Sequence, residues 1–358
     1  MPNLTIHQQT SEAVLGQRSR LAEALVEQEF ARHPELVERY GRTGREKSLQ
    51  DAGYHLSFLG QALALDNREM FLDYIAWVKV MLGQRKVLAA DLAFHLECLI
   101  GVLRANLPTE AAELASTYVA AAVEAIPDMP DDMPTFLHEG EPLSPLAHQY
   151  LGALRRGERH IASQLIMSAV AAGTSVKQIY LHVFQPAQYE IGRLWQVNRM
   201  SVAEEHYCTA ATQLIMSQLY SYIFASPKHG RTLVATCVAG DLHEIGVRMV
   251  ADFFEMDGWS TYYLGSSTPN AAVVAAITER RADVLAVSAT ISYHVEAVRE
   301  LIRTVRQHPE CEHVRILAGG YPFNQDPELW EKVGADGSAS DAQQAIALAD
   351  QMVREIAK

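Results

Sequence analysis

The sequence predicts a multidomain α plus α/β protein, in which two all-α domains precede a doubly wound parallel sheet. Three observations support this fold class. Apolar residues recur at helical spacing over residues 1–126 and again over 146–226, without strand-like alternation. From residue 231 to 358, short β-rich runs alternate with helical segments. Between the two helical regions, residues 127–145 contain five prolines, which predicts a linker.

The first 126 residues are expected to form a globin-like or related domain of five or six helices. Thr10 or Ser11 is predicted to cap the first helix, which ends near Pro34. Further helices are expected over 36–40, 48–65, 68–82, 87–107 and 109–126. This domain offers aromatic, imidazole and cationic side chains that suit a planar, carboxylate-bearing tetrapyrrole. Ordinary packing and surface exposure are the alternative explanation for them. The candidates are His55, Trp77, Lys79 and His95.

Residues 146–226 are predicted to form a four-helix bundle, with helices over 146–156, 158–172, 175–195 and 202–225. Pro186 lies inside the third helix and is expected to kink or break it. Ser201 and Glu204 have the spacing of a capping box, which predicts the start of the fourth helix.

The last 128 residues, 231–358, alternate between strand and helix. Strands are expected at 232–238, 260–264, 284–288, 314–318 and 337–339, and helices near 246–256, 270–280, 294–307, 325–332 and 341–356. Strict alternation of this kind predicts a parallel sheet with helices on both faces, in the flavodoxin-like form.

Three short motifs follow three of these strands. Residues 241–246 (DLHEIG) come after the first strand, and a His in such a loop can point over the carboxyl ends of the sheet, where open α/β folds bind ligands. After 41 further residues come Ser288 and Thr290, and after another 28 residues come Gly319 and Gly320. A capping His and glycines that merely end a strand are the alternative, which a single short motif would favour.

This combination resembles the cobalamin-binding domain family, whose pattern is DxHxxG, then SxL, then GG at similar gaps. The resemblance implies that His243 binds cobalt from below and that Asp241 holds the other ring nitrogen. It implies a slot beside the sheet for the nucleotide tail, although Thr290 stands where the family usually has Leu. The expected contacts are Asp241, Leu242, His243, Ile245, Gly246, Ser288, Thr290, Gly319 and Gly320.

The bundle contains Trp195 followed ten and eleven residues later by Glu205 and His206. This spacing resembles the cobalamin-dependent photoreceptors. The resemblance implies that Trp195, Val202 and Glu205 cover the upper face of adenosylcobalamin, and that His206 binds cobalt after light removes the adenosyl group. Individually, a core Trp, a first-turn Glu and an incidental His would explain the three residues.

Taken over its whole length, the chain resembles the photocobilins, which carry biliverdin as well as adenosylcobalamin. That resemblance implies a light sensor that is not an enzyme. The bilin would lie near His55, Trp77, Lys79 and His95. Photolysis would change domain packing or a homo-oligomer, and the signal would pass to an unknown protein partner.

Two other classes compete with the sensor. A corrinoid methyl carrier of a methyltransferase system also places a helical bundle before a DxHxxG domain, and a cobalamin storage protein fits the same residues. A mutase-type enzyme would need a substrate barrel of about 250 residues, for which the chain shows no pattern.

Composition narrows the partners. Asp and Glu outnumber Lys and Arg by 43 to 30, giving a formal net charge of -13, which argues against direct binding to duplex DNA. Four scattered Cys without a CxxC pair indicate a reducing compartment. No signal-peptide pattern and no apolar run of membrane-spanning length are present, so we expect a cytoplasmic protein without a membrane anchor.

Overall fold

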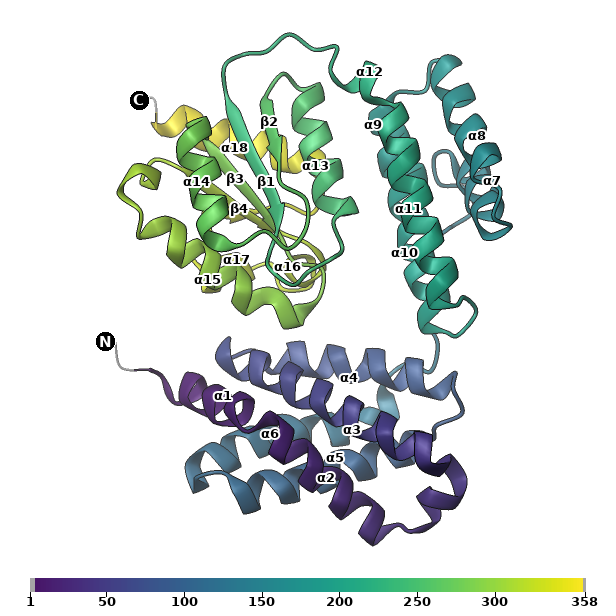
Figure 1. Cartoon of the computed structure of the whole chain (residues 1–358), viewed down its shortest axis with the longest axis vertical. Coiled ribbons are helices and arrows are strands. Elements are labelled where there is room, and N and C mark those ends of the chain that lie inside the picture. Colours follow the sequence, from purple (N-terminus) through teal and green to yellow (C-terminus); the bar gives the residue numbers. More distant parts are fainter. Residues whose placement is uncertain (1–3, 357–358) are drawn as a thin grey trace. The chain divides into compact units, whose positions relative to one another are not determined.

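The computed structural model describes residues 4–356 and contains two compact units. One unit extends to Met133, and the other begins at Pro134 (Figure 1). The division falls inside the proline-rich stretch. Between the 3-10 turn Ile126–Asp128 and residue 143, the chain forms neither helix nor strand.

The N-terminal unit is all-helical. Its described residues form α1 (Ile6–Gly16), α2 (Arg18–Arg32), α3 (Glu35–Ala64), α4 (Arg68–Gly83), α5 (Ala89–Asn106) and α6 (Thr109–Ala125). Because apolar residues recur three and four positions apart, each helix turns one stripe inward. Leu21, Leu25, Leu56, Leu59 and Phe71 are fully buried in the resulting core.

The first helix begins earlier than predicted. Thr5 caps α1 instead of Thr10 or Ser11, because its side chain accepts from the N–H of Gln8 while the Gln8 side chain bonds back to the Thr5 backbone. This capping box satisfies two N–H groups at once. Thr10 and Ser11 are buried within the helix, where the Ser11 hydroxyl donates to the carbonyl of Gly60 at 2.7 Å.

The expected gap between residues 40 and 48 is a kink inside α3. Gly41 has φ of +65°, a conformation that glycine adopts without a Cβ clash, and helix continues on both sides of it. The two predicted helices therefore form one kinked element.

The C-terminal unit starts with the helical bundle. Its helices are α7 (Ser144–Arg155), α8 (Arg159–Ala171), α9 (Val176–Ile179), the π-helix η2 (Tyr180–Phe184), α10 (Gln185–Gln196), α11 (Val202–Gln218) and α12 (Tyr220–Ile223). The chain does not break at Pro186. A π-helical turn precedes this proline and places it in the first turn of α10, where its missing N–H costs little. The predicted capping box of Ser201 and Glu204 is confirmed at the start of α11.

A five-stranded parallel sheet forms the rest of the unit, in the order β2-β1-β3-β4-β5 that is typical of the flavodoxin-like doubly wound fold. Its strands are β1 (Thr232–Cys237), β2 (Ser260–Tyr263), β3 (Val284–Ser288), β4 (Arg315–Gly319) and β5 (Gly337–Ser338). Leu233 to Cys237 are buried without interruption, as expected for a central strand covered on both faces.

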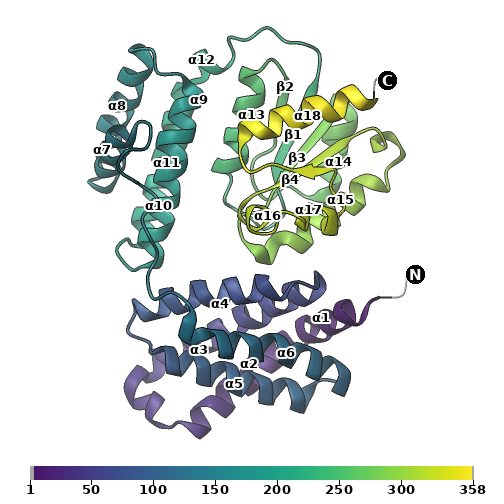
Figure 2. The same cartoon turned by 180° about the vertical axis from the view of Figure 1, so that it is seen from behind.

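Helices cover both faces of the sheet. Helices α13 (Ile245–Met256) and α18 (Ala342–Ile356) lie on one face, and α14 (Asn270–Arg280) and α15 (Val295–Arg306) lie on the other (Figures 1 and 2). The helix expected at 325–332 is wrong in extent. Two short helices, α16 (Tyr321–Gln325) and α17 (Leu329–Val333), flank a turn at Asp326, whose side chain accepts from the N–H of Glu328.

The bundle packs on the α13 face of the sheet domain. Within this face, the Tyr180 hydroxyl of η2 donates to Asp252 of α13 at 2.7 Å, and both residues are buried. Arg248 of α13 donates to the carbonyl of Gln213 at 3.2 Å and to Ser217 at 2.8 Å. Hydrogen bonds at different positions along α13 therefore hold the helical bundle and the sheet domain together.

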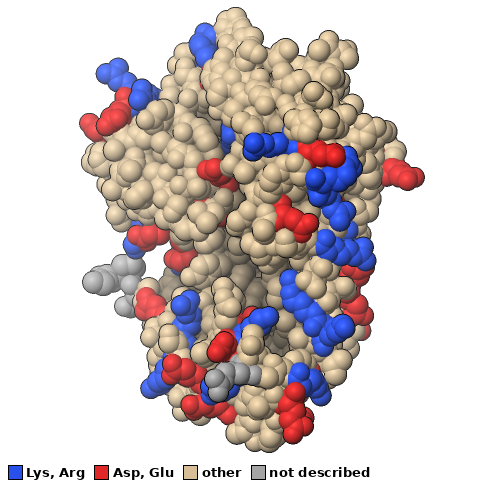
Figure 3. Space-filling view, turned by 45° about the vertical axis from the view of Figure 1, so that its right-hand side comes forward, with Lys and Arg blue, Asp and Glu red and all other residues tan. Residues whose placement is uncertain are grey.

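Charged side chains of both signs are interspersed on the face that Figure 3 shows, with wide uncharged areas between them. Among the described residues, no helix is both long enough and apolar enough to cross a bilayer.

Candidate functional site

The candidate site is centred on Asp241, in the loop between β1 and α13. This side chain is fully buried, and both of its oxygens are used. Oδ1 accepts from the backbone N–H of His243 at 3.0 Å and lies 2.8 Å from His243 Nδ1. Oδ2 accepts from the N–H of Thr290 at 2.6 Å. A single carboxylate thus joins the loop after β1 to the loop after β3.

These contacts keep Asp241 ionised. Burial by itself would raise its pKa, but hydrogen bonds from His243 and the Thr290 N–H, together with the nearby imidazole of His294, outweigh burial and hold the pKa of Asp241 well below its usual value. A buried anion is therefore available to orient and polarise an imidazole.

His243 is the exposed partner of that anion. Its side chain is 55% exposed, although Nδ1 is held by Asp241. The hydrogen bond to Asp241 raises the pKa of His243, burial opposes the rise, and the charges of Asp241 and Glu205 add to it. Because Nδ1 is engaged, Nε2 is the nitrogen that can meet a ligand above the strand ends.

All three predicted motifs meet at one edge of the sheet. Strands β1, β3 and β4 are neighbours, with Cys237 paired to Ser288 and Ser288 paired to Gly319. The carboxyl ends of these strands therefore place residues far apart in sequence side by side. Thr290 reaches the site through its backbone N–H, which donates to Asp241 and leaves the hydroxyl for other contacts.

The two glycines differ in what they require. Gly320 has φ of +110°, and a Cβ there would lie 2.0 Å from the carbonyl oxygen of Ala289, so the fold itself needs glycine. A Cβ on Gly319 would meet nothing within 4 Å. The space beside Gly319 is therefore open to a ligand that approaches the backbone.

The predicted upper residues lie on the ends of α10 and α11 in the bundle. Trp195 is half-buried and packs against the core of the unit. Val202 is exposed, and His206 is exposed with Nδ1 against the carboxylate of Glu205. Thr209 donates to Glu205 at 3.0 Å. Helix α11 lies beside the motif loop, because Gln213 of this helix bonds to Glu244, the neighbour of His243, at 2.7 Å.

The four bilin candidates differ in their burial and in their partners. His55 and His95 are buried in the core of the N-terminal unit with ring centroids 5.2 Å apart. His55 Nδ1 lies 2.8 Å from the Tyr74 hydroxyl. Lys79 is engaged by the Met129 carbonyl at 2.6 Å and by Asp131 at 2.9 Å, whereas Trp77 is 37% exposed.

Two contacts at the site were missed in the sequence. His294, in the turn after β3, places Nδ1 3.6 Å from Asp241 Oδ2. Gln213 of α11 donates to Glu244, the neighbour of His243, at 2.7 Å. Neither residue belongs to a recognisable spacing, because only the folded chain brings these segments together.

Comparison with known proteins connects this geometry to a cofactor. Residues 231–347 match a family described as B12 binding domain, and residues 146–220 match a second family with the same description. Dimethylamine corrinoid protein 1 of Methanosarcina acetivorans is 27% identical over 192 residues, which are 53% of this chain and 83% of that protein. The dimethylamine corrinoid protein of Methanosarcina barkeri is 24% identical over the same shares.

Among solved structures, the monomethylamine corrinoid protein of Methanosarcina barkeri shares the fold. Its TM-score is 0.52 at 20% identity, covering 58% of this chain and 98% of that one. The chain is a cobalamin-binding protein, and the named relatives are corrinoid proteins, not the photoreceptors that the bundle motif suggested. The matched regions begin at residue 146 and leave the N-terminal unit unassigned.

Proposed function

We propose that this cobalamin-binding protein holds its corrinoid over the carboxyl ends of β1, β3 and β4, and that it serves a methyltransferase as a methyl carrier. The observation that carries the proposal is the Asp241–His243 pair, with a buried anion behind a half-exposed imidazole. The protein would be the partner of a catalyst and would not turn over substrate alone.

His243 is the proposed lower axial ligand through Nε2. Asp241 would fix the tautomer of His243 and make its imidazole a stronger electron donor to the metal. A carboxylate that bonds to the other ring nitrogen of a metal-bound His commonly has this effect. Leu242 is 74% exposed beside it and offers an apolar surface to the corrin ring. Ile245 and Gly246 are the first two residues of α13, immediately after the loop.

The slot for the nucleotide tail is proposed beside Gly319. Open space at its Cα, the half-buried Ser288 and Thr290, and the obligatory turn at Gly320 border the same edge of the sheet. Hydroxyl groups at Ser288 and Thr290 would bond to polar atoms of the tail, while the missing side chain at Gly319 permits close approach.

The carrier role is supported by the similarity of this chain to named corrinoid proteins. When bound, cobalamin supplies a cobalt centre that accepts and releases a methyl group. For this chain the task is then to hold the lower ligand, to shield the upper face with Trp195 and Val202, and to yield that face to a partner enzyme. The curated relatives are named as dimethylamine corrinoid proteins, and each is matched over most of its length.

Reconstitution with hydroxocobalamin tests the lower ligand. After chemical reduction of the bound cobalt to Co(II) in protein labelled with 15N-histidine, we expect His243 in place of the benzimidazole, visible as the superhyperfine doublet of a 15N nucleus in the electron paramagnetic resonance spectrum, whereas a bound benzimidazole would give the triplet of 14N. His243→Ala should lose that signal and bind about tenfold or more weakly. His160→Ala, an exposed His on α8, is the matched control. A histidine signal that persists in His243→Ala would remove His243 as the ligand.

A light sensor is the second candidate, favoured by the Glu205–His206 pair at the start of α11, the helix whose Gln213 contacts the motif loop. In this reading the form bound is adenosylcobalamin, and His206 approaches cobalt from above after illumination. His206→Ala should change the illuminated absorption spectrum but leave the dark spectrum intact, and green light should change the mass on size exclusion. Equal effects on both spectra, with a mass that does not change in light, would exclude the light sensor and leave the methyl carrier as the proposed function.

Biliverdin binding by the N-terminal unit stays a prediction tied to the sensor. The buried His55–His95 contact offers two imidazoles in one core, while Lys79 is already engaged. Mixing the protein with biliverdin and measuring a far-red absorption band would test it, with His55→Phe as the variant expected to lose the band.

A further inference from the structure

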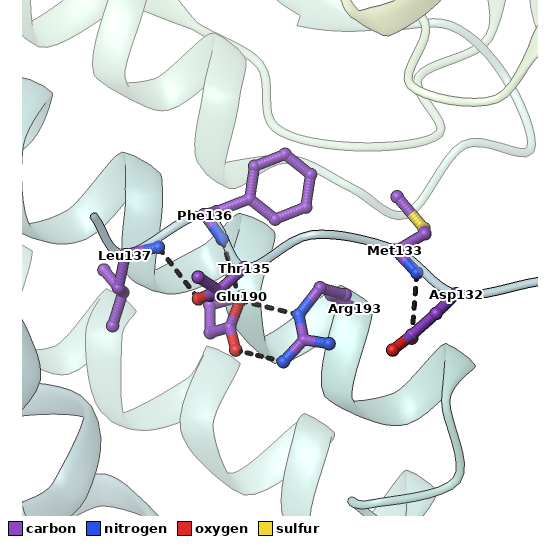
Figure 4. Close-up of polar contacts among 7 residues, drawn as sticks. All are labelled: Asp132, Met133, Thr135, Phe136, Leu137, Glu190 and Arg193. Atoms are coloured by element: carbon purple, nitrogen blue, oxygen red, sulfur yellow. Dashed lines mark hydrogen bonds and ion pairs between the residues drawn. The ribbon is translucent and has the colours of Figure 1, made fainter. Parts of the chain in front are cut away.

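The segment that leaves the linker is fastened to helix α10 by a buried carboxylate. Glu190 and Arg193 are only 5% and 8% exposed. They form a two-pronged ion pair, with Arg193 Nη2 2.6 Å from Glu190 Oε1 and Arg193 Nε 2.9 Å from Oε2. Oε2 also accepts from the Thr135 hydroxyl at 3.1 Å and from the Phe136 N–H at 3.0 Å (Figure 4). These four residues are called the linker clamp.

The clamp fixes three consecutive residues of the linker. The Leu137 N–H donates to the Thr135 hydroxyl at 3.2 Å, and the Leu137 side chain is buried (Figure 4). The Phe136 ring lies 5.4 Å from the ring of Tyr189. Burial would raise the pKa of Glu190, but hydrogen bonds from Arg193, Phe136 and Thr135 outweigh it and lower the pKa. The carboxylate therefore stays charged as an acceptor for the linker.

The clamp lies on the helix that carries the upper-face residue. Arg193 precedes Trp195 by two positions, and both belong to α10 (Gln185–Gln196). A short regular helix moves as a body, so a shift of its Trp195 end also moves Glu190. A buried carboxylate that loses donors is costly, which favours a linker either fully docked or fully released. Coupling of this kind requires two discrete states of the linker, docked on α10 as here or released from it.

We propose that the linker clamp couples the upper face of the cobalamin site to the linker: the group that Trp195 contacts sets, through α10, whether residues 135–137 are docked. The role of Trp195 in this coupling rests on the proposed function. When residues 135–137 are docked on α10, the end of the linker next to the bundle is fixed; when they are released, it is free to move.

Hydrogen–deuterium exchange at the amides of Phe136 and Leu137 measures docking directly. We would compare protein without cobalamin, with hydroxocobalamin and with adenosylcobalamin, all in the dark, because the last two differ in the upper ligand. Thr135→Val removes the hydroxyl and keeps the ion pair. Thr278→Val is the matched control, since Thr278 is half-buried on α14, away from the linker, and its hydroxyl donates to Ala275 of the same helix.

In wild-type protein we expect exchange at these amides to differ about tenfold between the two cobalamin forms. Thr135→Val should exchange about tenfold faster in every form and lose that difference, with unchanged cobalamin spectra. Thr278→Val should match wild type. Equal exchange in the two loaded wild-type forms would overturn the coupling, and wild-type exchange rates in Thr135→Val would overturn the clamp.

Glu190→Gln is a second variant, because it keeps an acceptor oxygen but loses the charge that holds Arg193. It should release the linker as Thr135→Val does; a linker that stays protected would count against the clamp. Should this variant fail to fold by circular dichroism, Thr135→Val decides alone. A wild-type protein that develops no bound-cobalamin spectrum would overturn the proposed function and the coupling together. The comparison without cobalamin would still decide the clamp.

Discussion

At the scale of single residues, Asp241 determines the site. Its two oxygens join the loops after β1 and β3, and its charge survives burial only because His243, Thr290 and His294 surround it. An imidazole held in this way presents one defined nitrogen. Because the same carboxylate joins the loops after β1 and β3, the imidazole of His243 is oriented only when both loops have folded against each other.

The two neighbouring glycines allow a prediction that separates fold from ligand. Gly320→Ala should lower the unfolding free energy by about 2 kcal/mol or more, because it adds a Cβ at positive φ against the Ala289 carbonyl. Gly319→Ala should leave stability within about 0.5 kcal/mol of wild type but weaken cobalamin binding. Urea denaturation and spectral titration measure the two effects. Unimpaired cobalamin binding in Gly319→Ala would show that the nucleotide tail does not lie beside Gly319.

At the scale of elements, the bundle meets the sheet domain through a buried acid on α13. Burial raises the pKa of Asp252 from 3.8 to about 6, although the Tyr180 hydrogen bond and the charge of Arg248 lower it and Glu255 adds to the rise. In the unfolded chain this acid ionises near its usual value. Stability is therefore greatest below about pH 4 for this group, and it is lost as pH rises to about 6 and beyond.

Asp252→Asn should remove this pH dependence while keeping an acceptor for the Tyr180 hydroxyl. We expect the variant to gain stability relative to wild type, with the gain about 1 kcal/mol larger at pH 8 than at pH 5. Urea unfolding at both pH values measures it. Asp257→Asn, on the more exposed Lys177 pair in the same interface, should change little. A gain that is equal at both pH values would show that Asp252 does not titrate in this range.

At the scale of the whole molecule, the cobalamin half is a unit in its own right. Residues from Pro134 onward form one compact unit, and both matches to B12 binding domain families, residues 146–220 and 231–347, lie within it. The N-terminal unit has its own helical core. Each unit therefore contains an apolar core of its own.

A fragment of residues 134–358 should fold and bind cobalamin with the spectrum of the full chain. Circular dichroism, a melting curve and the bound-cobalamin spectrum measure this, with residues 1–133 produced separately as the matching half. An unfolded or cobalamin-free 134–358 fragment would show that the N-terminal unit is required for the cobalamin half to form.

Much of this fold could be predicted because its signals are local. The five strands, most helices and the Ser201 capping box follow from periodicity and cap residues, which act within a few positions. The predictions differ from the structure where local rules compete: Thr5 caps the first helix instead of Thr10 or Ser11, and Gly41 bends a helix without ending it. At Pro186, which was expected to kink or break its helix, the helix does not break but contains a π-helical turn. The family resemblance of the motifs indicated cobalamin, whereas the finer identification as a photoreceptor lacks support from the named relatives.

The sequence by itself determined the order of strands and helices and the three loops that carry the cobalamin motifs, because each depends on neighbours along the chain. Only the tertiary structure decided that His294 and the Thr290 N–H surround Asp241, that Gln213 reaches Glu244, and that Glu190 holds the linker. Those contacts join residues separated by 31 to 55 positions. They exist because a parallel sheet brings strand ends together and a helical bundle packs beside it, and no local spacing encodes that meeting.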